Sequence, residues 1–246
     1  MASISDDFNR ADGAVGANWS VDTGNAGDAT TVGWRVISNT LRYDGLTRND
    51  TLCLRWVGTA LASANYYVEI VIDKVSDSNN APGPMGRKPA GTGDANSDGY
   101  GIAYYEDTTY LMEYTNSGEA SLGTYGTTDT AAHTLRLVCD GSRISANIDG
   151  TERIAVTGET TYTTGAVGIQ FSAWEAAAAD TMDNFAAADL AAEAPSPFPP
   201  VPASRILKTA YSTLVRMFRV LLKYREIIWR LEEHTPLSSK VLLELV

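Results

Sequence analysis

Apolar and polar residues alternate in short runs between His133 and Gly168. A period of two residues is typical of strands that bury one face and expose the other. The dipeptides Asp140-Gly141 and Asp149-Gly150 separate these runs, and both suit tight hairpin turns that need positive φ. The segment is therefore predicted to be an antiparallel meander with one face in water.

The same alternation recurs earlier and later in the chain, between clusters of Gly, Asn and Asp. Further strands are expected at Gly33–Ile37, Thr40–Tyr43, Thr51–Val57, Tyr66–Val75, Tyr100–Tyr105, Tyr110–Thr115, Ala166–Ser172 and Met182–Ala187. The segment 77–99 is rich in proline and glycine, and we expect it to be a long irregular loop. No convincing helical pattern separates the strands, so the fold class is predicted to be all-β, a two-sheet antiparallel sandwich.

The composition changes abruptly at Ala194. Five prolines lie between Pro195 and Pro202, which is typical of a semi-rigid polyproline spacer. Ser204 can then cap an amphipathic α-helix that ends near His234. We therefore expect three parts: a sandwich at 1–193, a Pro-rich linker at 194–203, and a helix with a tail at 204–246.

The predicted helix carries a narrow basic stripe and a wide apolar surface. The apolar residues expected at an interface are Leu207, Tyr211, Leu214, Phe218, Leu221, Ile228 and Trp229. Burying each such side chain contributes about 1.5 to 3 kcal/mol, so an isolated helix would lose a large stabilisation. The spacer favours a cover from another chain, in a homo-oligomer or a larger assembly. Packing on its own domain and binding flat on a membrane surface remain alternatives.

Charge is distributed unevenly along the chain. Residues 1–203 contain 11 Lys or Arg against 26 Asp or Glu, whereas residues 204–246 contain eight against four. An acidic body repels phosphate backbones, so no nucleic acid partner is expected. The N-terminus shows no signal peptide pattern, and no window approaches the roughly 20 apolar residues of a membrane span. Cys53 and Cys139 lie in strand runs and are expected to be reduced core residues, with a single disulfide as the alternative.

Four stretches between about residues 4 and 190 carry a family resemblance: DDFNRADGAVGANW, DGYGIAYYEDTTYLMEY, LRLVCDG with ISANIDGT, and GAVGIQF with DNFAAADL. They resemble the concanavalin A-like (laminin-G-like) jelly rolls that occur in bacterial surface proteins and bacteriophage structural proteins. The resemblance implies a jelly roll whose first and last strands are adjacent, which places Asp7-Phe8 near Asn184-Phe185. Phe8, Trp19, Trp34 and Phe185 are expected to be core aromatics.

The acidic residues do not form a recognisable catalytic pattern. A retaining glycoside hydrolase needs two carboxylates about 5 to 5.5 Å apart, which alternate residues of one strand can supply. Glu69 and Asp73 are four residues apart, and Glu106-Asp107 and Glu113 lack the spacing. The two histidines, at positions 133 and 234, support no triad or metal cluster. We therefore expect no catalytic residues and no enzymatic activity.

Two candidate binding sites remain. Asp94, Asn96 and Asp98, followed by Gly99, match the first half of a calcium-binding loop, although Tyr105 stands where that loop needs a bidentate Glu. Calcium is therefore a candidate cofactor. A second candidate is a group of five tyrosines, namely Tyr104, Tyr105, Tyr110, Tyr114 and Tyr125. Because strand residues alternate, about half of them should face the core. Tyr105, Tyr110 and Tyr114 are the candidate glycan-binding residues among them.

These features together favour a non-catalytic structural or interaction protein. The main hypothesis is a phage virion protein of the decoration or fibre type, which displays a jelly roll and is anchored through its C-terminal helix. We expect its location to be a virion or cell surface. The alternative is a carbohydrate-binding adhesin module that contacts cell-surface glycans, and a glycan hydrolase is the third hypothesis.

Overall fold

The computed structural model describes residues 1–22, 34–43, 50–74, 80–89, 98–105, 107–115, 118–126, 131–173 and 180–191. Residues 1–191 form one compact unit. The predicted linker at 194–203, the predicted helix and tail at 204–246, and the seven interface residues lie outside the described residues. Within the described ranges there is no helix, and hence none that could span a membrane.

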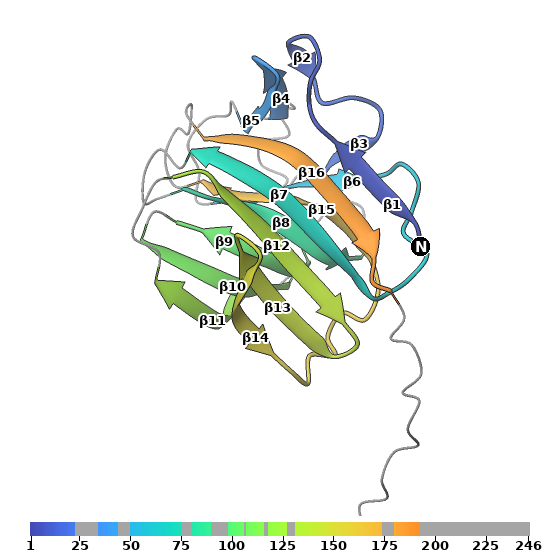
Figure 1. Ribbon diagram of the computed structural model, residues 1–246, viewed down its shortest axis with the longest axis vertical. Helices are drawn as coiled ribbons and strands as arrows, with labels where there is room; N and C mark the ends of the chain where they lie inside the picture. The colour runs from blue at the N-terminus through green and yellow to red at the C-terminus, as the bar shows by residue number, and fades with distance from the viewer. Residues whose placement is uncertain are drawn as a thin grey trace, which may run out of the picture. The chain divides into compact units, whose positions relative to one another are not determined.

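The described strands form two antiparallel sheets that pack face to face (Figure 1). The first sheet has the spatial order β14 (Thr151–Val156), β13 (Arg143–Ile148), β12 (His133–Asp140), β7 (Tyr66–Lys74), β16 (Thr181–Asp189), β5 (Thr40–Tyr43), β4 (Trp34–Ile37) and β2 (Gly13–Ala14), and β1 (Ser3–Asp6) also pairs with β16. The second sheet has the order β11 (Gly118–Gly126), β10 (Thr108–Thr115), β9 (Gly99–Tyr104), β8 (Asn80–Lys88), β15 (Ala166–Ala173), β6 (Asp50–Trp56) and β3 (Trp19–Asp22). The predicted all-β, two-sheet sandwich is confirmed.

The meander is built as its alternation predicted. In β12 and β13, Leu137 pairs with Ala146 and Cys139 pairs with Ile144, and all four side chains are buried. The turn between the two strands places Gly141 at a φ of +57°. Glycine adopts this left-handed conformation without steric cost, which explains the Asp-Gly signal in the sequence.

Aromatic side chains join the two sheets. Trp19 of the second sheet packs edge to face on Phe185 of the first, with ring centroids 4.8 Å apart. At another point, Trp34 of the first sheet meets Phe171 of the second at 6.3 Å. Phe8 is also fully buried. The four aromatics expected in the core are therefore confirmed there, and their large apolar area is a main source of stability.

The chain ends of the sandwich meet as the resemblance implied. Strand β1 pairs with β16, and Asp6 lies opposite Phe185. The Asp6 carboxylate accepts hydrogen bonds from both terminal nitrogens of Arg10, at 2.9 Å each, and from Trp19 Nε1 at 2.7 Å. The stretch DDFNRADGAVGANW thus encodes a polar clamp that fixes the N-terminal loop beside the core aromatics.

The segment 77–99 differs from its prediction. Residues 80–88 are not loop but strand β8, in the middle of the second sheet between β15 and β9. Pro82 and Pro84 cannot donate ladder hydrogen bonds, and β9 pairs with β8 at Met85 and Gly86, beyond both prolines. Strands β2, β3 and β11 were also not predicted as strands.

Cys53 and Cys139 form no disulfide and are fully buried, as expected for reduced core residues. Burial raises the pKa of the Cys139 thiol to about 12. The thiol is therefore protonated and unreactive at neutral pH.

Candidate functional site

The second sheet carries apolar side chains on both of its faces. One face contributes Ile102, Leu111 and Ile169 to the main core between the sheets. The opposite face carries a separate cluster of Cys53, Met85 and Tyr114, with Met112 packed against it. Because successive strand residues point to opposite faces, this second cluster marks the outer face of the sheet. A sheet face that combines apolar groups with an open pocket is a candidate ligand-binding surface.

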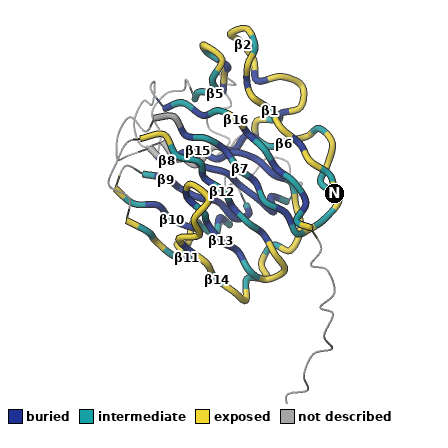
Figure 2. The backbone as a smooth tube through the Cα atoms, viewed as in Figure 1, coloured by how far each residue is buried: buried dark blue, intermediate teal, exposed yellow. Residues whose placement is uncertain are grey.

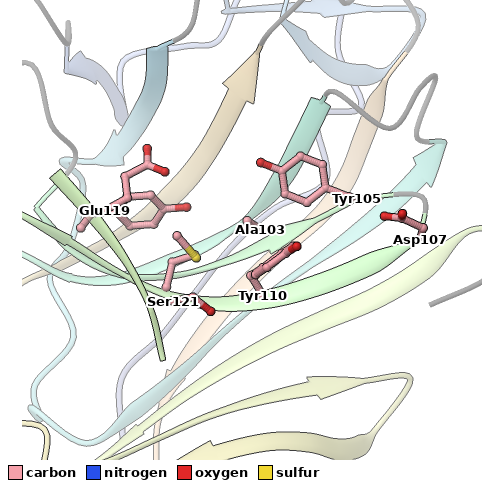
Figure 3. Close-up of a pocket in the computed structure, with 8 residues that line it drawn as sticks. Ala103, Tyr105, Asp107, Tyr110, Glu119 and Ser121 are labelled. Atoms are coloured by element: carbon pink, nitrogen blue, oxygen red, sulfur yellow. The ribbon is translucent and has the colours of Figure 1, made fainter. Parts of the chain in front are cut away.

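A pocket of about 560 Å³ lies on this outer face, at the end of the sheet formed by β9, β10 and β11 (Figure 3). Its lining residues are Ala103, Tyr105, Asp107, Tyr110, Met112, Tyr114, Glu119 and Ser121. Its volume lies within the roughly 300 to 1,000 Å³ range of small-ligand sites.

Strand register explains why these residues meet. Tyr110 of β10 lies opposite Ala103 of β9, and Tyr114 of β10 lies opposite Glu119 of β11. Residues that pair across antiparallel strands share a face of the sheet and lie close together. Ala103 provides a shallow floor, and the longer side chains rise around it. The pocket is thus set by the pairing of three neighbouring strands.

The three candidate glycan-binding tyrosines all line this one pocket. Tyr105 and Tyr110 contact each other edge to face, with centroids 5.6 Å apart and planes at 83°. The remaining two tyrosines of the group lie elsewhere: Tyr104 is buried in the main core, and Tyr125 packs against that core beside Arg153. The expectation that about half of the five face the core is met, while the binding role stays a prediction.

Two carboxylates give the pocket a negative character. In Figure 3, Glu119 and Asp107 lie toward opposite ends of the pocket, with Tyr105 and Tyr110 between them. None of the eight lining residues is Lys, Arg or His. Burial raises the pKa of the Tyr105 hydroxyl, and the nearby Glu119 carboxylate and Tyr110 raise it further. The hydroxyl therefore stays protonated at neutral pH and can donate a hydrogen bond.

Sequence reasoning did not identify Glu119 and Ser121 as site residues. Both belong to β11, a largely exposed edge strand with weak alternation that was not predicted (Figure 2). The polar residues at 119 and 121, two positions apart, were the available signal, because they place two side chains on one face. Asp107 was considered only as a member of an acid pair with unsuitable spacing.

A second pocket, of about 670 Å³, lies beside Asp6, Asp7, Arg10 and Glu69. Its acidic groups already have partners: Asp6 is held by Arg10 and Trp19, and Glu69 forms an ion pair with Arg136 at 2.6 Å. Its one aromatic lining residue, Phe185, is 1% exposed and belongs to the core. This pocket therefore fits a structural role better than a binding role.

The predicted calcium loop is only partly described. Asp94 and Asn96 lie outside the described residues, and Asp98 stands just before β9. Together with burial, the negative charge of Asp98 helps to raise the pKa of Tyr162 to about 12. Within the described ranges, no group of three His, Cys, Asp or Glu side chains could hold a metal ion. Calcium binding here stays a prediction.

No protein-family model matches the chain, and no curated protein matches its sequence. Solved structures do match. A Bacillus licheniformis β-glucanase superposes with a TM-score of 0.54 at 13% identity, over 78% of this chain and 99% of the enzyme. The endo-β-1,3-glucanase of Pyrococcus furiosus gives a TM-score of 0.52 at 14% identity, over 77% of this chain and 94% of the enzyme. The exoplasmic/lumenal domain of VIP36, solved in a Ca²⁺/Man3GlcNAc-bound form, gives 0.50 at 13% identity, over 72% and 86%.

The expectation of no enzymatic activity is corrected by these matches, because two glucanases share this scaffold. That expectation rested on acid spacing within one strand. Spacing within one strand is not a sufficient criterion, because strand pairing also places residues of different elements side by side, as it does Tyr114 of β10 and Glu119 of β11. Identities of 13 and 14% establish the architecture alone. The chain therefore has the concanavalin A-like jelly-roll fold, which the two glucanases and the VIP36 domain share.

Proposed function

We propose that the protein binds carbohydrate in the pocket formed by β9, β10 and β11. One observation carries the proposal: three tyrosines, two carboxylates and a serine hydroxyl line a single pocket of about 560 Å³. Sugars present C–H faces that pack on aromatic rings and hydroxyls that hydrogen-bond to carboxylates and phenols. Carbohydrate is also the ligand named for the VIP36 domain, which has this fold.

A glycan array of broad chemistry tests the proposal on the full chain. We expect saturable binding to a restricted set of oligosaccharides. Competition with the free sugar should then abolish the signal, since one pocket holds the ligand. An array without saturable signal, repeated at high protein concentration, would contradict carbohydrate binding.

Hydrolysis of a bound glucan is a second candidate function. The observation in its favour is the scaffold shared with two glucanases, together with the Glu119 carboxylate in the pocket, since glycosidases use carboxyl groups beside the scissile bond. Release of reducing ends from β-glucan should then occur with the native chain and disappear in Glu119→Gln. Release by both proteins would point to a contaminant, and release by neither would leave binding as the function.

We also propose that the jelly roll is displayed on a virion or cell surface, and that segment 204–246 assembles it there. The support lies in the sequence, where a proline-rich spacer precedes a helix pattern with a wide apolar surface. A sugar-binding domain held away from a particle by such a spacer could reach glycans on a host cell.

A further inference from the structure

We propose that the pocket selects glycans that carry positive charge, namely amino sugars with a free ammonium group, over neutral and anionic sugars. This inference rests on the proposed carbohydrate binding and names the substrate class. Three features of the lining residues support it: the sign of their charge, the arrangement of their aromatic rings, and the position of Glu119.

The charged lining residues are all acidic. Asp107 and Glu119 are the two ionisable carboxylates of the pocket, and the other six lining residues are Ala, Tyr, Met or Ser. An ammonium group near either carboxylate gains Coulomb attraction, whereas a uronate or sulfate group meets repulsion. The whole chain has a formal net charge of −11, which adds a long-range preference of the same sign.

The aromatic rings add a second source of attraction for cations. Tyr105 and Tyr110 stand at 83° to each other, so their ring faces point in different directions around the pocket. A cation within about 6 Å of a tyrosine face gains roughly 0.5 to 1 kcal/mol at an exposed site. Recognition sites for quaternary ammonium ligands use aromatic rings in this way. A neutral sugar can pack on the same tyrosine rings but gains no cation–π attraction.

Glu119 is placed to act together with the rings. It lies opposite Tyr114 in the register of β10 and β11, and its charge acts on the hydroxyl of Tyr105. A sugar ring packed on the tyrosines can therefore direct an amino substituent toward this carboxylate. Glu119 is thus the residue expected to determine specificity, while the half-buried Tyr105 and Tyr110 provide most of the aromatic contact area.

The test compares β-1,4-linked hexamers of glucosamine, N-acetylglucosamine and glucose, which differ only in the substituent at C2. Titration calorimetry on the full chain should give a dissociation constant roughly 5- to 30-fold lower for the glucosamine hexamer, from one ion pair and one cation–π contact. Glu119→Gln removes the charge and should remove most of this preference, so the three hexamers should then bind with similar affinities. Raised salt should reduce the preference as well.

Asp140→Asn is the matched control, because it removes an exposed carboxylate from the β12–β13 turn, outside the pocket. It should keep the preference in full. If both variants lost the preference for the glucosamine hexamer equally, the preference would arise from general attraction of a polycation to an acidic protein. That result would overturn the inference. Equal binding of all three hexamers would overturn the inference but leave carbohydrate binding intact. Absence of binding by any sugar, the array included, would overturn both.

Discussion

Tyr110 shows how one residue can serve the site without serving the core. It stands on the outer face of β10, half-buried, with its ring against Tyr105 and its neighbour Leu111 on the core face. A side chain in this position contributes contact area for a ligand, while few core contacts depend on it. Truncation of Tyr110 to alanine should therefore change ligand affinity with little effect on the core.

Tyr110→Ala should weaken the binding of an array-selected oligosaccharide. Loss of one stacking face costs about 1 to 2 kcal/mol, which corresponds to roughly 5- to 30-fold in Kd. Tyr67→Ala is the matched control, because it removes a half-buried tyrosine from β7, which belongs to the other sheet and does not line the pocket of β9, β10 and β11. Titration calorimetry should show native affinity for the control. Equal affinity of both variants would place the ligand elsewhere.

Asp6 links the N-terminal clamp to pH. Burial alone would raise the pKa of its carboxyl, but hydrogen bonds from Arg10, Trp19 and the Phe8 N–H outweigh burial and lower the pKa below its ordinary value of 3.8. A lowered pKa in the folded state means that the unfolded chain binds the proton more readily. The stabilisation is therefore complete above pH 3.8 and is lost as the pH falls through the lowered value.

Asp6→Asn should lower the free energy of unfolding at pH 7 and make its decline in acid shallower. Urea denaturation between pH 7 and pH 2.5 measures both effects. Asp7→Asn is the control, because the Asp7 carboxylate accepts a hydrogen bond from the adjacent Asn9 N–H in an exposed position. The control should show the same decline of the unfolding free energy in acid as the native protein. If Asp6→Asn showed that same decline as well, the clamp would not be the source of the acid sensitivity.

Strand β8 shows how a segment with prolines can occupy the middle of a sheet. The Gln170 side chain of β15 donates hydrogen bonds from Nε2 to the carbonyl oxygens of Ala81, at 3.1 Å, and Ile102, at 2.7 Å. It thus bridges β8 and β9 in the region where the proline nitrogens cannot donate. Gly83 completes the arrangement, because a Cβ at this position would clash with the Ile102 carbonyl oxygen.

Gln170→Met keeps the volume of this buried side chain but leaves two buried carbonyl oxygens without this donor. Each carbonyl oxygen left without a donor costs about 1 to 3 kcal/mol, so we expect the free energy of unfolding to fall by roughly 2 to 6 kcal/mol. Urea denaturation followed by tryptophan fluorescence measures the change. A loss below about 0.5 kcal/mol, the usual scale for a neutral surface change, would show that the bridge is dispensable.

The same elements explain how much the sequence could predict. Strands such as β12, β13 and β5 were located to within a few residues, because their alternation is a local signal. The prolines and glycines of β8 predict a loop, because the Gln170 bridge that permits the prolines comes from a residue 89 positions away from Ala81. The tyrosines of β10 were recognised as site candidates, but their partner Glu119 was not, since cross-strand register is a long-range property.

At the scale of the whole molecule, the jelly roll should be able to fold without the C-terminal segment. Residues 1–191 form a compact unit with a core that includes Phe8, Leu54 and Phe185. The predicted helix at 204–246 has a wide apolar surface that needs a cover, and assembly with further chains would provide it. Folding and assembly would then reside in different parts of the chain.

Light scattering on the full chain and on residues 1–193 tests this division. We expect an oligomer for the full chain and a folded monomer after truncation, because the truncation removes the predicted interface residues and no strand of the described sheets. Thermal unfolding of the truncated chain should stay cooperative, which controls for damage to the jelly roll. If the truncated chain kept the mass of the native oligomer, assembly would have to arise from the jelly roll itself. Sugar binding retained by the monomer would place recognition in the pocket and leave avidity to segment 204–246.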